Sequence, residues 1–172
     1  ISNHIGLENF YDDEKNFLAK TLYSEYALNL ISKELSKQIY ASENTRKKCL
    51  VLDLDNTLWG GVLGEEGPYS IKLGNSFEGE KFIRFQKYIK DLSNKGIILA
   101  ILSKNNLDDV KECFKKNPNM ILNFNDFTSY RINWREKYLN INEIASELNI
   151  GKDAMVFFDD SKFERDQMLK MN

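Results

Sequence analysis

Two aspartates that are one residue apart follow a short apolar run and could serve one pocket. They belong to the sequence Asp53-Leu54-Asp55-Asn56-Thr57, at the end of a strand predicted over residues 49–54. Residues i and i+2 of a strand point to the same side, so both carboxylates can reach one site. Two carboxylates this close repel each other unless a cation lies between them, and a hard divalent cation such as Mg²⁺ suits them.

Further polar groups stand at similar places along the chain. The segment Ser103-Lys104-Asn105-Asn106 follows a second apolar run, at a helix start where polar donors bind anions well. The acidic pair Asp159-Asp160 follows the last apolar run, and Lys137 begins a predicted helix between the two. Together these groups favour binding of a metal and an anion. The reaction that they support is phosphoryl transfer with an aspartate as the nucleophile.

Each of these residues also has a purely structural interpretation. An Asp-x-Asp sequence after a strand is common in turns, and both Ser103 and the acidic pair could cap helices. A single lysine such as Lys137 is most often a solvated surface residue. The functional interpretation depends on the order of all four groups. The sequence has no Gly-x-x-x-x-Gly-Lys-Ser/Thr loop, and a receiver domain would carry its acid pair first rather than last.

Alternating apolar runs and helical patterns predict the elements that position these groups. Strands are predicted over residues 49–54, 97–102, 120–122 and 155–158. The helices between them carry apolar side chains at helical spacing: Phe82, Phe85, Ile89 and Leu92 before Gly96; Leu107, Val110 and Phe114 between the cap Asn106 and Pro118; Ile141, Ile144 and Leu148 before Gly151. This alternation predicts an α/β fold with a parallel sheet and helices on both faces. In such sheets ligands bind at the carboxyl ends of the strands.

Residues 1–46 have a different pattern and are predicted to form a short helical segment of two helices. In the second helix, apolar side chains recur at helical spacing after the N-cap candidate Ser24: Leu28, Ile31, Leu35 and Ile39. The polar stretch 41–48 separates this segment from residues 47–172, which we expect to form the catalytic domain.

Composition excludes several classes of protein. The chain has 172 residues, of which 42% are hydrophobic and 12% aromatic, enough for one packed core. Its 24 basic and 26 acidic side chains give a net charge of −2, which does not support a basic surface for nucleic acid or membrane. No apolar run approaches the ~20 residues that cross a bilayer. Two cysteines cannot form a disulfide framework, so we expect a cytoplasmic location.

The order of the motifs resembles that of the haloacid dehalogenase (HAD) superfamily, and the local sequence is similar to its FkbH-like branch, subfamily IIIC. The similarity lies in residues 48–67, in Ile132-Asn133-Trp134 before Lys137, and in Phe158-Asp159-Asp160 with Phe163-Glu164-Arg165. The branch commonly has Gln-Pro and Asn-Pro where Arg135-Glu136 and Ser161-Lys162 stand here. Neither departure replaces a catalytic position.

The resemblance implies a role for each matching residue. Asp53 would be the nucleophile that forms an aspartyl phosphate, and Asp55 would be the general acid and base. Lys137 would neutralise the phosphate, with substrate contacts from Thr57, Ser103, Lys104 and Asn105. Mg²⁺ would be bound by Asp53, the main-chain carbonyl of Asp55, and Asp160 aided by Asp159.

The resemblance also implies a phosphorylated substrate and a partner. Some members dephosphorylate 1,3-bisphosphoglycerate and load the glyceryl group onto an acyl carrier protein, as in polyketide biosynthesis, whereas others are known only as phosphatases. The gaps between the motifs leave no room for a large cap domain, so we expect an open site with residues 60–78 as its only flap. Relatives usually continue past the last motif, so we expect this sequence to be a piece of a longer protein.

A second class of function stays open, namely a non-catalytic HAD-like module that docks a carrier or partner protein. The intact set of motif residues argues against such a dead scaffold. Trp59 and Trp134 stand near the motifs, and we expect both to pack over the pocket. Cys49 and Cys113 fall well below the carboxyl edge, so we expect buried thiols rather than carriers of a thioester.

Overall fold

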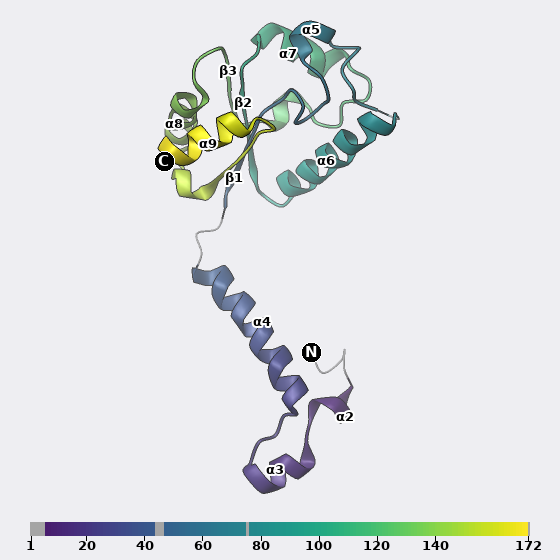
Figure 1. Ribbon diagram of the computed structural model, residues 1–172, viewed down its shortest axis with the longest axis vertical. Coiled ribbons are helices and arrows are strands. Elements are labelled where there is room, and N and C mark those ends of the chain that lie inside the picture. Colours follow the sequence, from purple (N-terminus) through teal and green to yellow (C-terminus); the bar gives the residue numbers. More distant parts are fainter. Residues whose placement is uncertain (1–5, 44–46, 75, 172) are drawn as a thin grey trace. The chain divides into compact units, whose positions relative to one another are not determined.

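The chain divides into two compact units, Ile1–Arg46 and Lys47–Asn172 (Figure 1). The structure, a computed structural model, describes residues 6–43, 47–74 and 76–171. The boundary between the units falls within the polar stretch 41–48. Within the described ranges, no helix is both long enough and apolar enough to cross a membrane.

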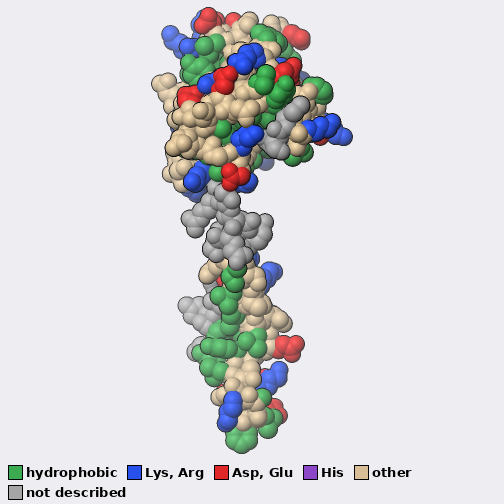
Figure 2. All heavy atoms as spheres, turned by 90° about the vertical axis from the view of Figure 1, so that its left-hand side faces the viewer, with side chains coloured by type: hydrophobic (Ala, Val, Ile, Leu, Met, Phe, Trp, Pro, Cys, Tyr) green, Lys and Arg blue, Asp and Glu red, His purple; other side chains and the backbone are tan. Residues whose placement is uncertain are grey.

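The N-terminal unit contains α2 (Leu7–Phe10), α3 (Asp13–Ala19) and α4 (Glu25–Glu43). Two short helices precede α4 where one was expected, because Asp12 caps a new helix by accepting from the Lys15 N–H at 2.9 Å. The predicted cap Ser24 is confirmed, since its Oγ accepts from the Ala27 N–H at 3.1 Å. Hydrophobic side chains lie on the surface of this unit (Figure 2), among them Phe17, Leu18, Leu28, Leu35 and Ile39.

Four parallel strands form the sheet of the second unit: β1 (Cys49–Leu52), β2 (Ile98–Ser103), β3 (Ser129–Ile132) and β4 (Met155–Phe158). The strand order is β3-β2-β1-β4. The central strand β1 pairs its Cys49 with Ile98 of β2 and with Met155 of β4. The parallel α/β sheet expected from the sequence is confirmed, and the carboxyl ends of all four strands meet at one edge.

Helices cover both faces of this sheet, as expected. The described helices of the unit are α5 (Leu63–Glu66), α6 (Phe77–Asn94), α7 (Leu107–Lys116), α8 (Lys137–Leu148) and α9 (Lys162–Met171), with 3₁₀ turns η1 (Phe124–Asp126) and η2 (Lys152–Ala154). Successive strand residues face opposite sides, so Val51 and Leu52 belong to different cores. Leu52 packs in the core of α6 and α7 with Ile89, whereas Val51 packs in the core of α8 and α9 with Ile144 and Met168.

The predicted flap folds back onto the core of the unit. Gly60 and Lys72 exchange two backbone hydrogen bonds, of 3.1 and 2.8 Å. Three apolar side chains of this segment are buried: Leu63, Ile71 and Leu73. The described part of residues 60–78 is therefore a packed layer rather than a free flap, and it forms no large cap over the sheet.

The strand predicted over residues 120–122 does not form, and the third strand is β3 instead. The N–H groups of Ile121 and Leu122 donate to Oε1 of Gln86, at 3.0 and 3.2 Å, instead of to a neighbouring strand. Gln86 is fully buried on α6, and its Nε2 donates to the Leu58 carbonyl at 2.9 Å. One side chain thus satisfies three backbone groups, which gives this apolar segment an ordered path without a sheet.

Replacing Gln86 with leucine should destabilise the protein by about 2–4 kcal/mol, because leucine fills the space but leaves three backbone groups buried and unpaired. Urea denaturation would measure the free energy of unfolding. Lys87→Leu, at the next and exposed position of α6, is the control and should change stability by less than about 0.5 kcal/mol. A loss for Gln86→Leu as small as that of the control would contradict this account.

Candidate active site

The carboxyl edge of the sheet brings residues from all four predicted motifs together. Asp53 directly follows β1, Ser103 ends β2, Lys137 begins α8, and Asp159-Asp160 follows β4. The parallel register of β1 with β4, continued by the hydrogen bond of the Asp53 N–H to β4 at 3.0 Å, sets Asp53 beside Asp159. The strand pairing therefore places the first and fourth motifs at the same height above the sheet.

Lys137 is the buried cation of this site. Its side chain is only 4% exposed, and its Nζ lies 3.0 Å from Oδ1 of Asp53 and 2.6 Å from Oδ2 of Asp159. An ammonium group at this depth is costly unless it is paired and hydrogen-bonded. The two carboxylates provide that compensation, so the lysine joins the ends of β1 and β4 to the start of α8.

Burial raises the pKa of Asp53 above its ordinary value. The ammonium group of Lys137 and the hydrogen bond from the Ser103 hydroxyl both act in the opposite direction, whereas the charge of Asp159 adds to the rise in pKa. The protein thus compensates the negative charge at this end of β1 only in part. A bound cation would compensate the remainder.

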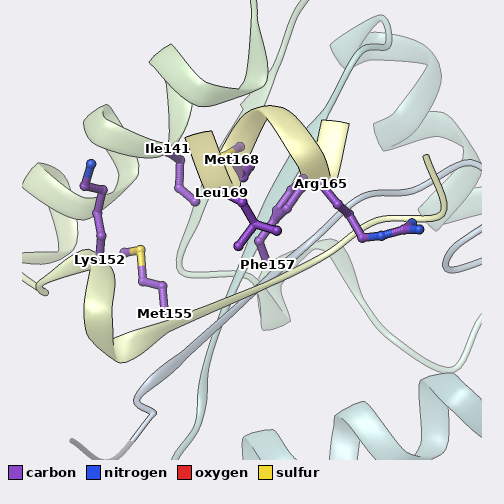
Figure 3. A pocket seen from close by; sticks show the side chains of 7 residues that line it. All are labelled: Ile141, Lys152, Met155, Phe157, Arg165, Met168 and Leu169. Atoms are coloured by element: carbon purple, nitrogen blue, oxygen red, sulfur yellow. The ribbon is translucent and has the colours of Figure 1, made fainter. Parts of the chain in front are cut away.

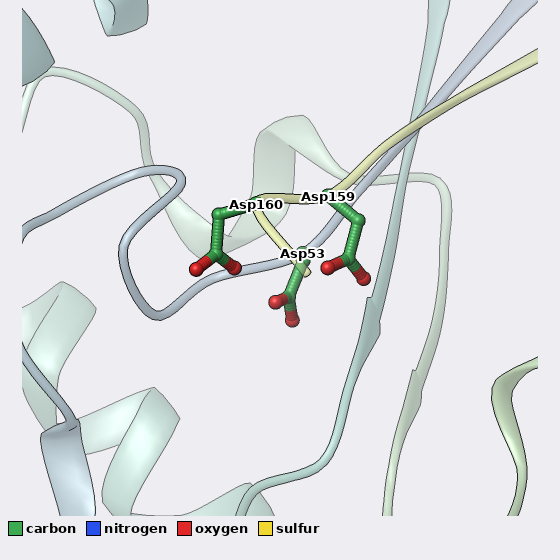
Figure 4. Close-up of side chains that lie close together, drawn as sticks. All are labelled: Asp53, Asp159 and Asp160. Carbon is green, nitrogen blue, oxygen red and sulfur yellow. The ribbon is translucent and has the colours of Figure 1, made fainter. Parts of the chain in front are cut away.

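Asp53, Asp159 and Asp160 make up the only group of three metal-ligand side chains found among the described residues (Figure 4). One carboxylate oxygen of each lies within 4.8 Å of the others. Asp159 is occupied on both oxygens, by Lys137 and by the Ser161 N–H at 2.8 Å. Asp160 is exposed and has no cation partner in the described part of the chain. An all-oxygen set of this kind fits a hard divalent cation such as Mg²⁺, and Asp160 is its most available ligand.

Asp55 lies outside this group, because three N–H donors hold its carboxylate. Oδ1 accepts from the Trp59 indole at 2.9 Å and from the Leu63 N–H at 3.1 Å, and Oδ2 accepts from the Asn105 amide at 2.9 Å. Trp59, which was expected to pack over the pocket, is fully buried and contacts Asp55 from the core. Its spacing of four residues from Asp55 is the signal that could have revealed the contact. Trp134, by contrast, is 70% exposed.

The remaining predicted substrate contacts, Thr57, Ser103 and Lys104, have different surroundings. Hydrogen bonding from the Ser103 hydroxyl acts to lower the pKa of Asp53. The Thr57 hydroxyl is buried and has no hydrogen-bond partner in the described ranges. The Lys104 ammonium pairs with two glutamates, at 2.9 and 3.5 Å. Contact of these three groups with a substrate stays a prediction.

Arg165, which the motifs did not select as a site residue, fixes the acidic pair from α9. Its guanidinium donates to the main-chain carbonyls of Asp159 and Asp160, the latter at 2.7 Å. Its side chain also lines an apolar groove of about 280 Å³ between α8, β4 and α9 (Figure 3), which contains none of the predicted site residues. The position of this arginine, about one helical turn beyond the acidic pair, is the signal that could have identified it.

One solved structure is similar to this chain along almost its whole length. It is the crystal structure of the N-terminal part of the protein BF1531 from Bacteroides fragilis, which contains a phosphatase domain and is complexed with Mg. The two chains are 41% identical, with a TM-score of 0.77. The match covers 99% of this chain and 46% of that one, so this chain spans less than half of that structure.

A second solved structure is a more distant likeness. It is a HAD family enzyme, BT-2542 from Bacteroides thetaiotaomicron, in complex with magnesium and inorganic phosphate, at 15% identity and a TM-score of 0.47 over 72% of this chain and 90% of that one. This likeness is too weak to support a functional conclusion. No family model and no curated protein matches the sequence. The first likeness is to a chain that contains a phosphatase domain with bound Mg, and neither likeness tests the FkbH-like branch.

Asp160→Asn should weaken Mg²⁺ binding more than Asp159→Asn does. The charge of Asp160 has no cation partner among the described residues, whereas Asp159 is already held by Lys137 and Ser161. Calorimetric titration of Mg²⁺ into both variants and the unaltered protein would measure the dissociation constants. We expect a loss of about tenfold or more for Asp160→Asn. The opposite order would show that Asp159 is the principal ligand.

The same titration should depend on pH in a defined direction. Although Asp160 is exposed, its carboxylate is partly desolvated, and this desolvation and the charge of Asp159 raise its pKa. Protons therefore compete with the metal at a higher pH than they would at an ordinary aspartate, and Mg²⁺ affinity should fall on acidification through that raised range. A matched titration of Asp160→Asn should lose this part of the pH dependence.

Proposed function

We propose that this chain is a Mg²⁺-dependent phosphatase of the HAD type that forms an aspartyl phosphate on Asp53. The observation that carries the proposal is the buried Lys137 between Asp53 and Asp159, beside a group of three carboxylates. The similar structure from Bacteroides fragilis, with its phosphatase domain and bound Mg, supports it. That chain is more than twice as long, so the proposal concerns the activity of this unit alone.

Asp53 supplies the nucleophile in this proposal. Lys137 holds its Oδ1 at 3.0 Å, so the other oxygen can attack phosphorus in line with the leaving oxygen. The bond from Asp53 to phosphorus forms as the bond from phosphorus to the leaving group breaks. Lys137 stays beside the transferring group and stabilises its negative oxygens. Mg²⁺ held by Asp53 and Asp160 would share these oxygens and neutralise their charge.

Asp55 supplies the proton transfers. In the first half of the reaction it donates a proton to the leaving oxygen. In the second half it takes a proton from the water that attacks the aspartyl phosphate, which releases inorganic phosphate and restores Asp53. The donors on its carboxylate, from Trp59, Leu63 and Asn105, set the direction in which Asp55 can reach the leaving group.

A finer proposal follows from the resemblance to FkbH-like enzymes. The substrate would be 1,3-bisphosphoglycerate, and an acyl carrier protein would receive the glyceryl group. The open edge supports this proposal, because the described part of residues 60–78 forms no cap that would exclude a carrier protein. A phosphate-release screen over glycolytic phosphates, with and without Mg²⁺ and a carrier protein, would test the finer proposal. It would distinguish a phosphatase from a transferase and from a module that only docks a partner protein.

In that screen, Asp53→Asn should abolish phosphate release while the fold is retained, because an amide of the same shape cannot attack phosphorus. Asp55→Asn should slow release by about 10²- to 10⁴-fold, the usual contribution of one general acid or base. Asp91→Asn, at an exposed position of α6, is the matched control and should behave as the unaltered protein does. Unaltered release by Asp53→Asn would refute the proposed mechanism.

The two cysteines should not carry an acyl group. Both are buried in the core, where burial raises the pKa of Cys49 to about 11 and that of Cys113 to about 12. Both thiols therefore stay protonated at neutral pH, and the thiolate nucleophile forms only far above it. Cys49→Ser and Cys113→Ser should keep phosphate release, with no stable acyl-enzyme.

Mass spectrometry of the intact protein after incubation with 1,3-bisphosphoglycerate and Mg²⁺ would check for such an adduct. An adduct of glyceryl size that disappears in either serine variant would overturn the prediction and favour acyl loading.

A further inference from the structure

The end of β2 and the loop after it carry three consecutive side chains that face different parts of the site. Ser103 acts on the proposed nucleophile, since hydrogen bonding from its hydroxyl lowers the pKa of Asp53, and Asn105 donates to the proposed acid and base at 2.9 Å. Between them, Lys104 reaches out of the loop to Glu164, at 2.9 Å, and to Glu136, at 3.5 Å. The backbone position of Lys104 therefore affects both neighbours that touch the reacting carboxylates.

Glu164 is a buried carboxylate that depends on this lysine. The residue is only 7% exposed, and its Oε2 has no hydrogen-bond partner in the described ranges. Among the described residues, Lys104 is the one cation within ion-pair distance of it. A buried carboxylate without a cation is strongly unfavourable, so removal of Lys104 leaves the charge of Glu164 uncompensated. The hydrogen bond from Lys104 to Glu164 is also the largest cause of the raised pKa of Lys104.

Both glutamates stand next to other residues of the site. Glu136 directly precedes Lys137, and Glu164 lies one helical turn beyond Asp160. Its neighbour Arg165 donates to the carbonyl of Asp160 at 2.7 Å. The ammonium of Lys104 thus joins the segments that carry the second, third and fourth motifs.

We propose that Lys104 is a positioning residue, which holds Ser103 and Asn105 on the two reacting aspartates through its ion pair with Glu164. The effect of Lys104 on turnover rests on the proposed phosphatase function, whereas its effect on the structure of the loop does not. It assigns Lys104 a different role from the direct phosphate contact that the resemblance implies. A direct contact that drew the ammonium away from Glu164 would leave that buried carboxylate unpaired.

Kinetics of Lys104→Met, Glu164→Gln and the double variant would distinguish the two roles. If Lys104 acts through Glu164, each single variant should lower kcat by about 10- to 100-fold with little change in KM. The double variant should then be no slower than the slower single variant, because both changes remove the same interaction. Lys104→Arg keeps the charge and should retain kcat within about threefold.

Two results would overturn the proposal. The first is a Lys104→Met variant with raised KM and unaltered kcat beside a normal Glu164→Gln, which would make the lysine a phosphate ligand. The second is a double variant whose loss is the product of the single losses. Lys90→Met is the matched control, since it breaks the 2.7 Å pair with Asp126, which is similarly shielded from solvent but distant in the chain from the motifs. It should leave kcat and KM unchanged.

Amide hydrogen exchange tests the inference without turnover. In the full chain without Mg²⁺ or substrate, the amides of residues 103–106 should exchange faster in Lys104→Met and Glu164→Gln than in the unaltered protein, and they should not change in Lys90→Met. Unaltered exchange in the first two variants would refute the positioning role. Absence of phosphate release by the unaltered protein would refute the proposed function alone, and the exchange result would still decide this inference.

Discussion

The buried ammonium group of Lys137 is the interaction on which the rest of the site depends. An isolated ammonium at this depth would cost several kcal/mol or more, so it is tolerated only between Asp53 and Asp159, at 3.0 and 2.6 Å. Those carboxylates in turn would repel each other without it. The first turn of α8 and the ends of β1 and β4 are therefore held in one arrangement, because displacement of any of them leaves a buried charge unpaired.

This arrangement needs support from residues that do not touch the reacting group. Trp59 fixes the carboxylate of Asp55 from the core, and Arg165 fixes the turn of the acidic pair from α9. Gln86 plays the same kind of role away from the site, since it satisfies the backbone of a segment that has no strand partner. In each case one side chain pairs polar groups that would otherwise be buried without a partner. Because other backbone conformations would leave these groups unpaired, the observed local conformation is favoured.

The sequence predicted the fold well where elements depend on apolar periodicity, and less well where they depend on side-chain partners. The apolar runs that became β1 and β2 are almost wholly buried, so their composition reveals them, and β4 is equally apolar although Val156 and Phe158 are exposed. The sequence of the edge strand β3 is polar because it contains Arg131, and this side chain is accommodated by ion pairs with Glu143 and Glu147 of α8. The three-residue apolar run at 120–122 is more typical of a strand, but the N–H groups of Ile121 and Leu122 bond to Gln86. Such contacts follow from the fold and are invisible to a pattern along the chain.

The same limit applies to the carboxylates of the site, whose different roles are set by their partners rather than by their sequence. Asp159 is occupied by Lys137 and a backbone N–H, Asp55 is held by three donors, and Asp160 is exposed without a cation partner among the described residues. The carboxylate of Asp53 is only partly occupied: one oxygen lies on Lys137, and burial raises its pKa. In the proposed mechanism, identical side chains would therefore serve as scaffold, proton carrier, metal ligand and nucleophile at one sheet edge, because each environment leaves a different part of the carboxylate available.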